Sequence, residues 1–305
     1  MKLFVLVTLL ALCSGTAHAQ NVLRWCTGSQ TGNYQWAADQ VKHELDADTF
    51  QDVTLVQTTG SLMNLRKMMA NECDVGFSQQ DVVDQFVIEN PASHDMLVPI
   101  KTVYEEYVHI LCPVSSGWTT LSEMATAKGP KRLIIGPNGS GTAETWRIIR
   151  STNESKYGNV EIDHRAVDID SASIVMDSDN TCMLWVSGLN SSDMVAANEL
   201  SIRNHNKPML RLLTIDDNAL ALRKSSDGNP QYKRRAITPH PPADGHPALY
   251  DHLISGANVD VLVVRAVLMM RADYRDALKT KLGRFLRAIG DAQPIIWSRV
   301  NPAAD

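Results

Sequence analysis

The chain has few of the features that mark metal, redox or nucleic-acid-binding proteins. It has five cysteines in 305 residues, and none are spaced Cys-x-x-Cys as in many zinc and dithiol sites. Lysine and arginine (29) are outnumbered by aspartate and glutamate (34), which disfavours nucleic acid and anionic lipid as partners. Beyond residue 19 no apolar stretch is long enough to cross a membrane. We therefore expect no metal, no cofactor, no nucleic-acid partner and no embedded segment.

The first 19 residues have the pattern of an export signal. Lys2 supplies a positive charge, residues 3–12 are apolar, and residues 17–19 (Ala-His-Ala) match a small-x-small cleavage site. We expect cleavage after Ala19 and a periplasmic protein. Four cysteines remain, and in an oxidising compartment they can form two disulfides in three ways or stay as buried thiols. These are Cys26, Cys73, Cys112 and Cys182.

Short apolar runs alternate with helical patterns along the rest of the chain, which predicts an α/β fold with parallel sheets covered on both faces. The length predicts two lobes. The predicted strands are 22–28, 53–60, 74–77, 108–114, 132–135, 161–169, 181–188, 210–215 and 259–270. The predicted helices are 36–45, 62–69, 80–89, 192–199 and 273–290, besides one after residue 141. The last of these has an apolar stripe of Leu278, Leu282, Phe285, Leu286 and Ile289. The basic run 233–235 is interpreted as a solvated surface turn.

The stretch 132–147 is the most informative part of the chain. An apolar run ends at Ile135, residues 136–141 contain three glycines and a proline, and Thr142 begins a helical pattern in which Ser140 or Thr142 is the expected N-cap. Strand, glycine turn and helix N-terminus direct backbone N–H groups and the positive end of a helix dipole at one point. This geometry predicts an anion site, most simply for a carboxylate.

Three enzymatic or nucleotide-binding interpretations of this stretch fail on spacing. A phosphate-binding P-loop needs lysine where Thr142 stands, and a dinucleotide fingerprint needs glycine or alanine where Glu144 stands. A hydrolase nucleophile elbow needs glycines two residues before and after Ser140. An exported hydrolase that uses Ser140 with His109 or His164 is retained only as a distant alternative, and we expect no catalytic residue and no enzymatic activity.

Three earlier turns repeat the same design. Residues 27–40, 58–68 and 77–81 each follow a predicted strand and open a helix with small, hydroxyl or amide residues. The carboxyl ends of parallel strands share one edge of a sheet, where ligands bind. The repetition predicts a cleft that holds a polar, anionic small molecule without a nucleophile and base, because no histidine lies in these turns.

These turns, taken together, resemble one family. The set TGSQTGNY, TTGSLMNL, FSQQD, VYEEYVHIL and IGPNGSGT, in this order behind a signal sequence, is similar to the TAXI family. That family comprises the solute-binding proteins of tripartite ATP-independent periplasmic (TRAP) transporters. The resemblance covers residues 22–147 and continues more weakly through 246–273. It implies a type II periplasmic binding fold with the ligand between two lobes, and a small carboxylate ligand such as glutamate, glutamine or 2-oxoglutarate.

Carried over residue by residue, the resemblance implies ligand contacts from the first three turns and a carboxylate cradle in the far lobe. The implied contacts are Gly32, Tyr34, Ser61, Asn64, Gln79, Asp81, Ser140, Gly141 and Thr142. Asp81 is expected to bind a ligand amine. The region 176–194 departs from the family pattern because its Asp-Ala pair is absent. Trp185, Ser187 and Gly188 are therefore candidates by position only, and Trp185 is interpreted first as core. Tyr104, Glu105 and Glu106 are placed first at the hinge or the surface, with ligand contact as the alternative.

These observations predict lobe 1 from residues 20–108 plus 256–305 and lobe 2 from residues 109–255. Ligand bridges both lobes and favours the closed form, which docks as a monomer on the membrane subunits of a TRAP transporter. A receptor for a sensor kinase, a partner of an ABC importer and a structural or adhesive export protein remain alternatives.

Overall fold

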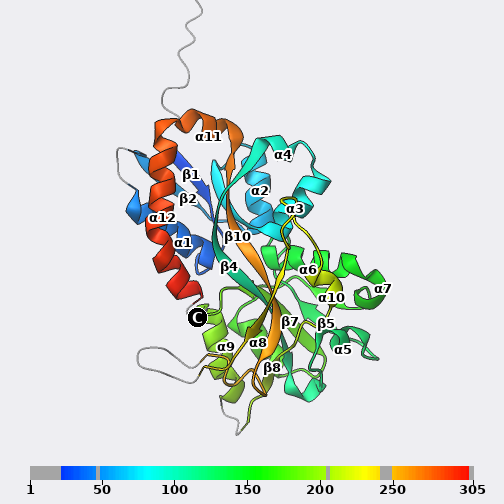
Figure 1. Ribbon diagram of the computed structural model, residues 1–305. Coiled ribbons are helices and arrows are strands. Elements are labelled where there is room, and N and C mark those ends of the chain that lie inside the picture. The colour runs from blue at the N-terminus through cyan, green and yellow to red at the C-terminus, as the bar shows by residue number, and fades with distance from the viewer. Residues whose placement is uncertain (1–21, 46–48, 204–206, 241–248, 302–305) are drawn as a thin grey trace, which may run out of the picture.

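The computed structural model describes residues 22–45, 49–203, 207–240 and 249–301, so the predicted signal sequence and its cleavage after Ala19 lie outside the described residues. Ten strands form one sheet in the order β2-β1-β3-β10-β4-β7-β5-β6, with β8 paired to β4 and β9 to β10 (Figure 1). Helices alternate with the strands, which confirms the predicted α/β class. No helix in the described part of the chain is long and apolar enough to span a bilayer.

The predicted elements occur in the predicted order, but the strand predicted at 108–114 begins at Leu97 and five short helices were not predicted. The strands are β1 (Val22–Cys26), β2 (Asp52–Val56), β3 (Val75–Gln79), β4 (Leu97–Pro113), β5 (Arg132–Ile134), β6 (Glu161–Asp163), β7 (Thr181–Ser187), β8 (Leu210–Leu212), β9 (Lys233–Ile237) and β10 (Val259–Arg271). The helices are α1 (Asn33–Glu44), α2 (Ser61–Met69), α3 (Gln80–Glu89), α4 (Ser93–Met96), α5 (Leu121–Thr126), α6 (Gly141–Thr152), α7 (Glu154–Tyr157), α8 (Ile169–Met176), α9 (Ser192–Ile202), α10 (Asn218–Ala221), α11 (Ala272–Leu278) and α12 (Thr280–Val300). A short 3-10 turn covers Val114–Ser116.

Two long antiparallel strands connect the halves of the sheet. β1 pairs in parallel with β2 and β3, and β5 pairs in parallel with β6 and β7. Between these groups, β10 and β4 pair antiparallel with each other, β10 with β3, and β4 with β7. Figure 1 shows β4 and β10 running from the upper half, near α2 and α12, into the lower half near β5 and β7. The expectation of purely parallel sheets was therefore incomplete.

Each of these two strands passes from the hydrophobic core of one half of the molecule to that of the other. Along β4, Tyr104 packs with the first half of the molecule and Tyr107 with the second; along β10, Val264 packs with the second half and Ala266 with the first. We use this change to define lobe 1 (β1–β3, α1–α4, α11, α12 and the adjoining ends of β4 and β10) and lobe 2 (the remainder). On β4 the change lies between Tyr104 and Tyr107, whereas the proposed boundary follows residue 108, and the first part of β10 packs in lobe 2 although residues 256–305 were assigned to lobe 1.

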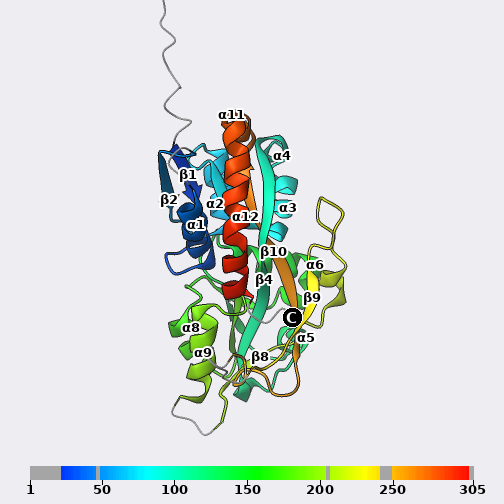
Figure 2. The same cartoon turned by 60° about the vertical axis from the view of Figure 1, so that its left-hand side comes forward.

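The lobe 1 sheet is covered on both faces. Trp25 packs with α1 and α12 on one face, and its neighbour Cys26 packs with α2 and α3 on the other, because successive side chains of a strand point to opposite faces. Figure 2 shows α1 and α12 side by side in front of this sheet. At the lower end of α12, Val300 contacts Gly188 of lobe 2 and accepts a hydrogen bond from the Asn190 N–H (3.4 Å).

Several local predictions were wrong. Residues 161–169 form a strand only to Asp163, and α8 begins at Ile169 behind the N-cap Asp168. The basic run 233–235 is not a surface turn but part of β9, which pairs with β10. The charged residues gave no strand pattern in the sequence. Such charge is tolerated in β9 because this strand lies at the edge of the sheet. The predicted helix 273–290 is two helices, α11 and α12, and the second continues to Val300.

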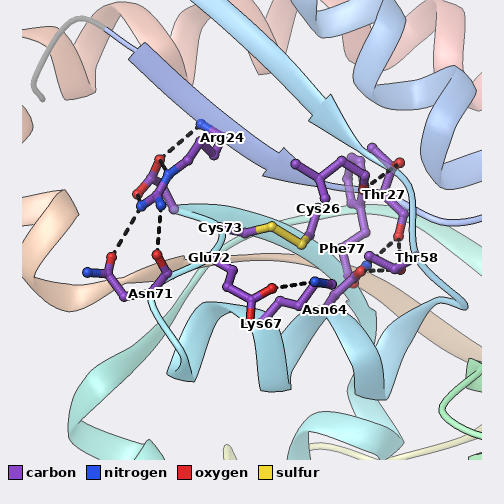
Figure 3. Close-up of a disulfide and its surroundings, with 12 residues drawn as sticks. Arg24, Cys26, Thr27, Thr58, Asn64, Lys67, Asn71, Glu72, Cys73 and Phe77 are labelled. Carbon is purple, nitrogen blue, oxygen red and sulfur yellow. Dashed lines mark hydrogen bonds and ion pairs between the residues drawn. A yellow bond between two sulfur atoms is a disulfide. The ribbon is translucent and has the colours of Figure 1, made fainter.

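The four described cysteines form two disulfides, so the pairing that was left open is now decided. Cys26 pairs with Cys73 in lobe 1, and Cys112 pairs with Cys182 across β4 and β7 in lobe 2. Figure 3 shows the Cys26–Cys73 bridge beside α2. Each disulfide therefore lies within one lobe and leaves relative movement of the lobes unconstrained.

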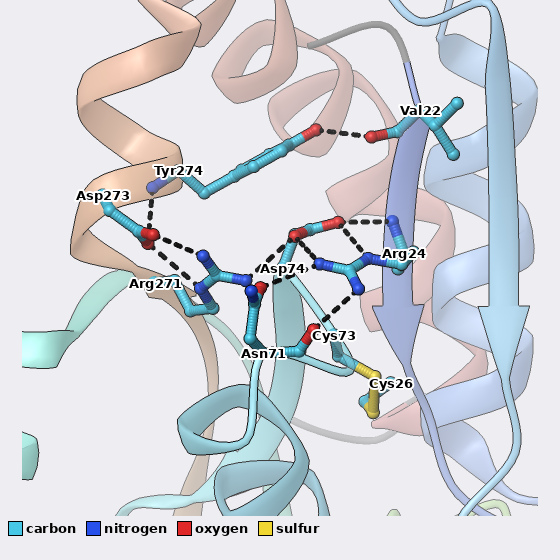
Figure 4. A network of polar contacts seen from close by, with 9 residues as sticks. All are labelled: Val22, Arg24, Cys26, Asn71, Cys73, Asp74, Arg271, Asp273 and Tyr274. Atoms are coloured by element: carbon cyan, nitrogen blue, oxygen red, sulfur yellow. Dashed lines mark hydrogen bonds and ion pairs between the residues drawn. A yellow bond between two sulfur atoms is a disulfide. The ribbon is translucent and has the colours of Figure 1, made fainter. Parts of the chain in front are cut away.

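A buried carboxylate joins three strands at the outer end of lobe 1. Asp74, which is 3% exposed, accepts hydrogen bonds from the backbone and side chain of Arg24 and forms a second ion pair with Arg271 (3.5 Å). Nearby, the Tyr274 hydroxyl donates to the Val22 carbonyl (3.0 Å; Figure 4). These contacts connect β1, β3 and the end of β10, and so anchor the C-terminal segment in lobe 1.

Candidate functional site

A cavity of about 430 Å³ lies between the lobes, and helix N-termini converge on it. Its lining includes the N-cap residues of six helices, which are Gly32 (α1), Gly60 (α2), Gln79 (α3), Ser140 (α6), Asp168 (α8) and Ser191 (α9). Lobe 1 supplies the first three and lobe 2 the others. Each N-terminus carries a partial positive charge and N–H groups without an intrahelical partner. The cavity is therefore suited to an anion.

The two lobes differ in how these helices are capped. In lobe 2 the side chains of Ser140, Asp168 and Ser191 each accept a hydrogen bond from the first turn of their own helix. In lobe 1 no N-cap side chain does so on α1, α2 or α3. The Met63 N–H of α2 is bonded to the Gly139 carbonyl and the Val82 N–H of α3 to the Asp81 carboxylate. The first-turn residues that border the cavity on the lobe 1 side are Asn33 and Tyr34 of α1 and Ser61 of α2, and a ligand anion can accept from their N–H groups.

Most of the predicted site residues line this cavity. They are Gly32, Tyr34, Ser61, Gln79, Ser140, Gly141 and Thr142. The Ser140 hydroxyl caps α6 by accepting from the Ala143 N–H (3.1 Å), and the Thr142 hydroxyl accepts from the Val186 N–H (3.2 Å). These two hydroxyls thus hold the glycine turn and β7 together as well as bordering the cavity.

Asn64 lies behind the cavity wall, contrary to the prediction that it contacts ligand. It is fully buried, and its amide donates to the carbonyls of Thr27 (2.6 Å) and Phe77 (2.8 Å) while its oxygen accepts from the Thr58 hydroxyl (2.6 Å; Figure 3). It therefore connects the ends of β1 and β3 to the turn after β2. Asn64 shapes the site without bordering it.

Asp81 also lies outside the cavity lining. Its carboxylate accepts from the hydroxyls of Tyr232 (2.6 Å) and Thr145 (2.7 Å). Tyr232 and Thr145 belong to lobe 2, so Asp81 joins the lobes instead of pointing at the ligand space. Burial raises the pKa of this carboxyl to about 6.

Glu106 lines the cavity, which agrees with the alternative of ligand contact and not with the first interpretation as hinge or surface. It is 4% exposed, and its Oε2 accepts from the Tyr34 hydroxyl (3.0 Å), whose oxygen is 3.1 Å from Ser61 Oγ. Burial raises the pKa of Glu106 to about 8. Two adjacent glutamates on one strand point to opposite faces, and only the tertiary structure shows that Glu106 rather than Glu105 points inward.

Two of the three lobe 2 candidates that were chosen by their position in the sequence line the cavity. Trp185 and Ser187 line the cavity, and Trp185 also packs in the lobe 2 core, as interpreted from the sequence. Gly188 packs against Val300 and is not in the lining. Asp168 and Asp193 also border the cavity, whereas no lysine, arginine or histidine does so among the described residues.

The lobes are in contact around the cavity. The Met63 N–H donates to the Gly139 carbonyl (3.2 Å), and the Thr145 hydroxyl donates to Gln79 Oε1 (3.2 Å). On the outside, Arg147 of α6 pairs with Glu89 of α3 (2.6 Å) and remains a surface arginine. This structure therefore represents a closed form.

The hydrolase alternative finds no support in the geometry. His109 is buried between the Trp185 carbonyl (3.2 Å) and the Tyr250 hydroxyl (2.8 Å), and burial lowers its pKa to about 4. His164 contacts the Gly136 carbonyl (3.1 Å). Neither histidine is hydrogen-bonded to Ser140, so within residues 22–45, 49–203, 207–240 and 249–301 this serine has no paired base. The same residues contain no cluster of three or more metal-ligating side chains.

Comparison with known proteins gives a family and a fold. The model of a family described as NMT1-like matches residues 25–237. A solved protein from Bordetella bronchiseptica RB50 is similar at 11% identity and a TM-score of 0.50, covering 92% of this chain and 76% of its own. No curated protein sequence matches the chain.

Two further solved structures are named binding proteins. The alkanesulfonate-binding protein SsuA from Xanthomonas axonopodis pv. citri, bound to MOPS, has 12% identity and a TM-score of 0.47, covering 89% of this chain and 73% of its own. A putative methionine-binding lipoprotein from Bacillus subtilis has 10% identity and a TM-score of 0.46, covering 92% and 96%. The predicted α/β fold is confirmed by the mixed sheet, and the likeness to the Bordetella bronchiseptica structure is a likeness of fold.

Proposed function

We propose that this chain, which belongs to the NMT1-like family, is a periplasmic solute-binding protein that captures a small carboxylate between its two lobes. The observation that carries the proposal is the convergence of six helix N-caps on one closed cavity, with the three in lobe 1 left without side-chain caps. A carboxylate accepts several N–H hydrogen bonds at such a site without needing an arginine.

Capture follows from the position of the cavity between the lobes. Lobe 1 supplies the uncapped helices and lobe 2 supplies Trp185 and Ser187, so a bound ligand makes its full set of contacts only when the lobes are closed. Ligand therefore shifts the equilibrium towards the closed form by its differential affinity. The hinge is formed by β4 and β10, on which the hydrophobic core changes from one lobe to the other.

The resemblance to TAXI proteins supports delivery to the membrane subunits of a TRAP transporter, with glutamate, glutamine or 2-oxoglutarate as model ligands. An ABC importer or a sensor kinase is the alternative recipient of the closed form. Uptake of labelled ligand into vesicles that contain candidate membrane subunits distinguishes a TRAP transporter from an ABC importer. Uptake driven by an ion gradient without ATP supports the TRAP assignment, and a strict need for ATP contradicts it.

A thermal-shift screen of amino acids and small carboxylic acids tests the capture itself. A ligand at a hundredfold its Kd adds about 2.7 kcal/mol to the free energy of unfolding. Native mass spectrometry of protein purified from its own periplasm gives an independent identification. Failure of every carboxylic acid to bind, together with a non-carboxylate ligand in the mass spectrum, would contradict the proposal.

Gly32 offers a direct test of the helix N-termini. The backbone of Gly32 is extended (φ −77°, ψ 158°), which any residue adopts, although a side chain there requires the Ser29 hydroxyl to turn away. Gly32→Asp places a carboxylate at the α1 N-cap, where it satisfies the helix internally and repels a second anion. We expect the melting temperature without ligand to stay the same or rise, and ligand affinity to fall at least tenfold. Gly32→Asn caps the helix without adding a charge, so its ligand affinity should fall less than that of Gly32→Asp.

A further inference from the structure

The charge of the cavity lining is opposite to what a purely anionic ligand requires. Three carboxyl groups border the cavity, from Glu106, Asp168 and Asp193, and no basic side chain is among the described lining residues. One oxygen of Asp168 is already engaged with the Ser171 N–H as the cap of α8. The partial charges of the helix N-termini offset one ligand carboxylate, but a second would be placed among these acids without a cation.

Glu106 is the most enclosed of the three. It lies on β4 between Tyr104 and Tyr107, where the hydrophobic core changes lobes. The titratable groups that face it are Tyr34 of α1, Tyr104 of the same strand and Asp81 of α3, and none is basic. An ionised carboxylate in such a place is costly unless a cation is supplied from elsewhere.

Tyr34 places this acid next to the positive ends of two helices. Its backbone is in the first turn of α1, and its hydroxyl donates to Glu106 and contacts Ser61, the first residue of α2. The Glu106 carboxyl group and the start of α2 therefore meet at the Tyr34 hydroxyl, and the N-terminus of α1 lies at the backbone end of the same residue. The ammonium and carboxylate groups of an α-amino acid are separated by a single carbon atom, so they match this arrangement.

We propose that the ligand carries an ammonium group that pairs with Glu106 while its carboxylate lies at the N-termini of α1 and α2. The ligand class is then a zwitterionic amino acid with a neutral side chain, such as glutamine, and not a dicarboxylate or keto acid. This inference rests on the proposed function and narrows it. It assigns Glu106, for which the sequence left both hinge or surface and ligand contact open, as the residue that determines specificity.

Proton linkage provides a signature that a structural role of Glu106 would not produce. In the empty cavity the pKa of Glu106 is about 8, so at pH 7 the carboxyl group is mostly neutral. An arriving ammonium group stabilises the ionised form, and most of one proton is released on binding. Affinity should then rise with pH, by at most tenfold per unit, and level off above about pH 8. If a neutral Glu106 instead donated a hydrogen bond to a ligand carboxylate, affinity would fall above that pH.

Titration calorimetry in two buffers of different ionisation enthalpy measures affinity and proton release together. The probes are the twenty protein amino acids and the amine-free acids 2-oxoglutarate, pyruvate, succinate and glutarate. We expect binding by at least one amino acid, and at least hundredfold weaker binding by every amine-free acid. Glu106→Gln, which preserves the acceptor for Tyr34, should weaken amino-acid binding at least thirtyfold and abolish proton release.

Two variants serve as comparisons. Glu105→Gln makes the same change one residue away, where the side chain pairs with Lys233 on the other face of β4, and it should bind like wild type. Asp193→Asn changes the other cavity acid that does not cap a helix. Its affinity for the amino acid should fall less than threefold. Unfolding midpoints without ligand confirm that all three variants fold.

The outcomes separate this inference from the proposed function. Binding confined to amine-free acids, an unchanged affinity in Glu106→Gln, or a loss confined to Asp193→Asn overturns the inference and leaves carboxylate capture standing. No binding by any probe overturns both. Amino-acid binding that releases a proton in wild type and not in Glu106→Gln supports both.

Discussion

Gln79 fills the space that a side chain at Gly141 would occupy. A β-carbon at position 141 would lie 2.6 Å from Gln79 Cδ and 2.7 Å from Ser61 Oγ. Gly141 is the first residue of α6 in lobe 2, whereas Gln79 and Ser61 are at the ends of β3 and α2 in lobe 1. The absent side chain therefore permits the close approach of the lobes over the cavity.

Gly141→Ala should consequently hinder closure. We expect ligand affinity to fall at least tenfold, because the added methyl group must displace the buried Gln79 side chain. The melting temperature without ligand should change little, since the lobes can separate to relieve the overlap. Calorimetry and thermal unfolding measure the two effects. Gly283→Ala is the matched control, because a β-carbon there meets nothing within 4 Å and alanine favours helix; unchanged affinity in both variants would contradict this view of closure.

Asp84 provides a second contact between the lobes. Its carboxylate accepts hydrogen bonds from Ser226, through backbone (3.2 Å) and hydroxyl (3.0 Å), and from Gln231 (3.0 Å). Asp84→Ala leaves these donors without their partner in the closed form. We expect ligand affinity to fall about tenfold or more, equivalent to about 1.4 kcal/mol. Asp95→Ala, at a side chain that is 92% exposed, should have no effect in the same titration.

The raised pKa of Asp81 predicts that the contribution of this residue to stability falls as pH rises. Burial raises its pKa from 3.8 to about 6 in the folded protein, so between these values the folded state binds more protons than the unfolded state. The stabilisation by protonation is complete below about pH 3.8 and is lost as pH rises through 6, with a total of roughly 3 kcal/mol. The difference in unfolding free energy between wild type and Asp81→Asn should follow this curve from pH 4 to 8. A flat difference would show that burial does not raise this pKa.

The two disulfides should stabilise the lobes separately. Closing loops with separations of 47 and 70 residues corresponds to about 4 kcal/mol each in the chain-entropy model. Cys26→Ala with Cys73→Ala should lower the stability of lobe 1, and Cys112→Ala with Cys182→Ala that of lobe 2. Thiol alkylation followed by peptide mapping should label none of these cysteines before reduction and all of them after it. Labelling of any of them in the oxidised protein would contradict the pairing.

Local patterns were enough to locate five of the six helix N-termini at the site, and only that of α8 was missed, because residues 161–169 were predicted to be a strand. Glycine, serine and threonine after each apolar run favour a turn and a helix start wherever they occur. The positions of Gly32, Ser61, Ser140 and Thr142 therefore followed from neighbouring residues, and these four line the cavity. The α/β class followed in the same way from the alternation of apolar runs with helical periods.

The errors arose where a role depends on residues far away in the chain. Asn64 has the chemistry of a ligand contact, but its partners Thr27 and Phe77 belong to two other strands. The strand β9 is stabilised by its pairing with β10, which no local propensity of the basic run 233–235 could reveal. Cysteine pairing likewise depends on which strands are neighbours.

The sequence by itself determined where the helices after β1, β2, β3 and β5 begin, because capping, turn formation and periodicity act over a few residues. The tertiary structure alone decided which of these ends share a cavity, which of Glu105 and Glu106 faces it, and which buried acid joins the lobes instead. Those outcomes depend on strand order and on the face that each side chain occupies, and both are set by packing between segments distant in the chain.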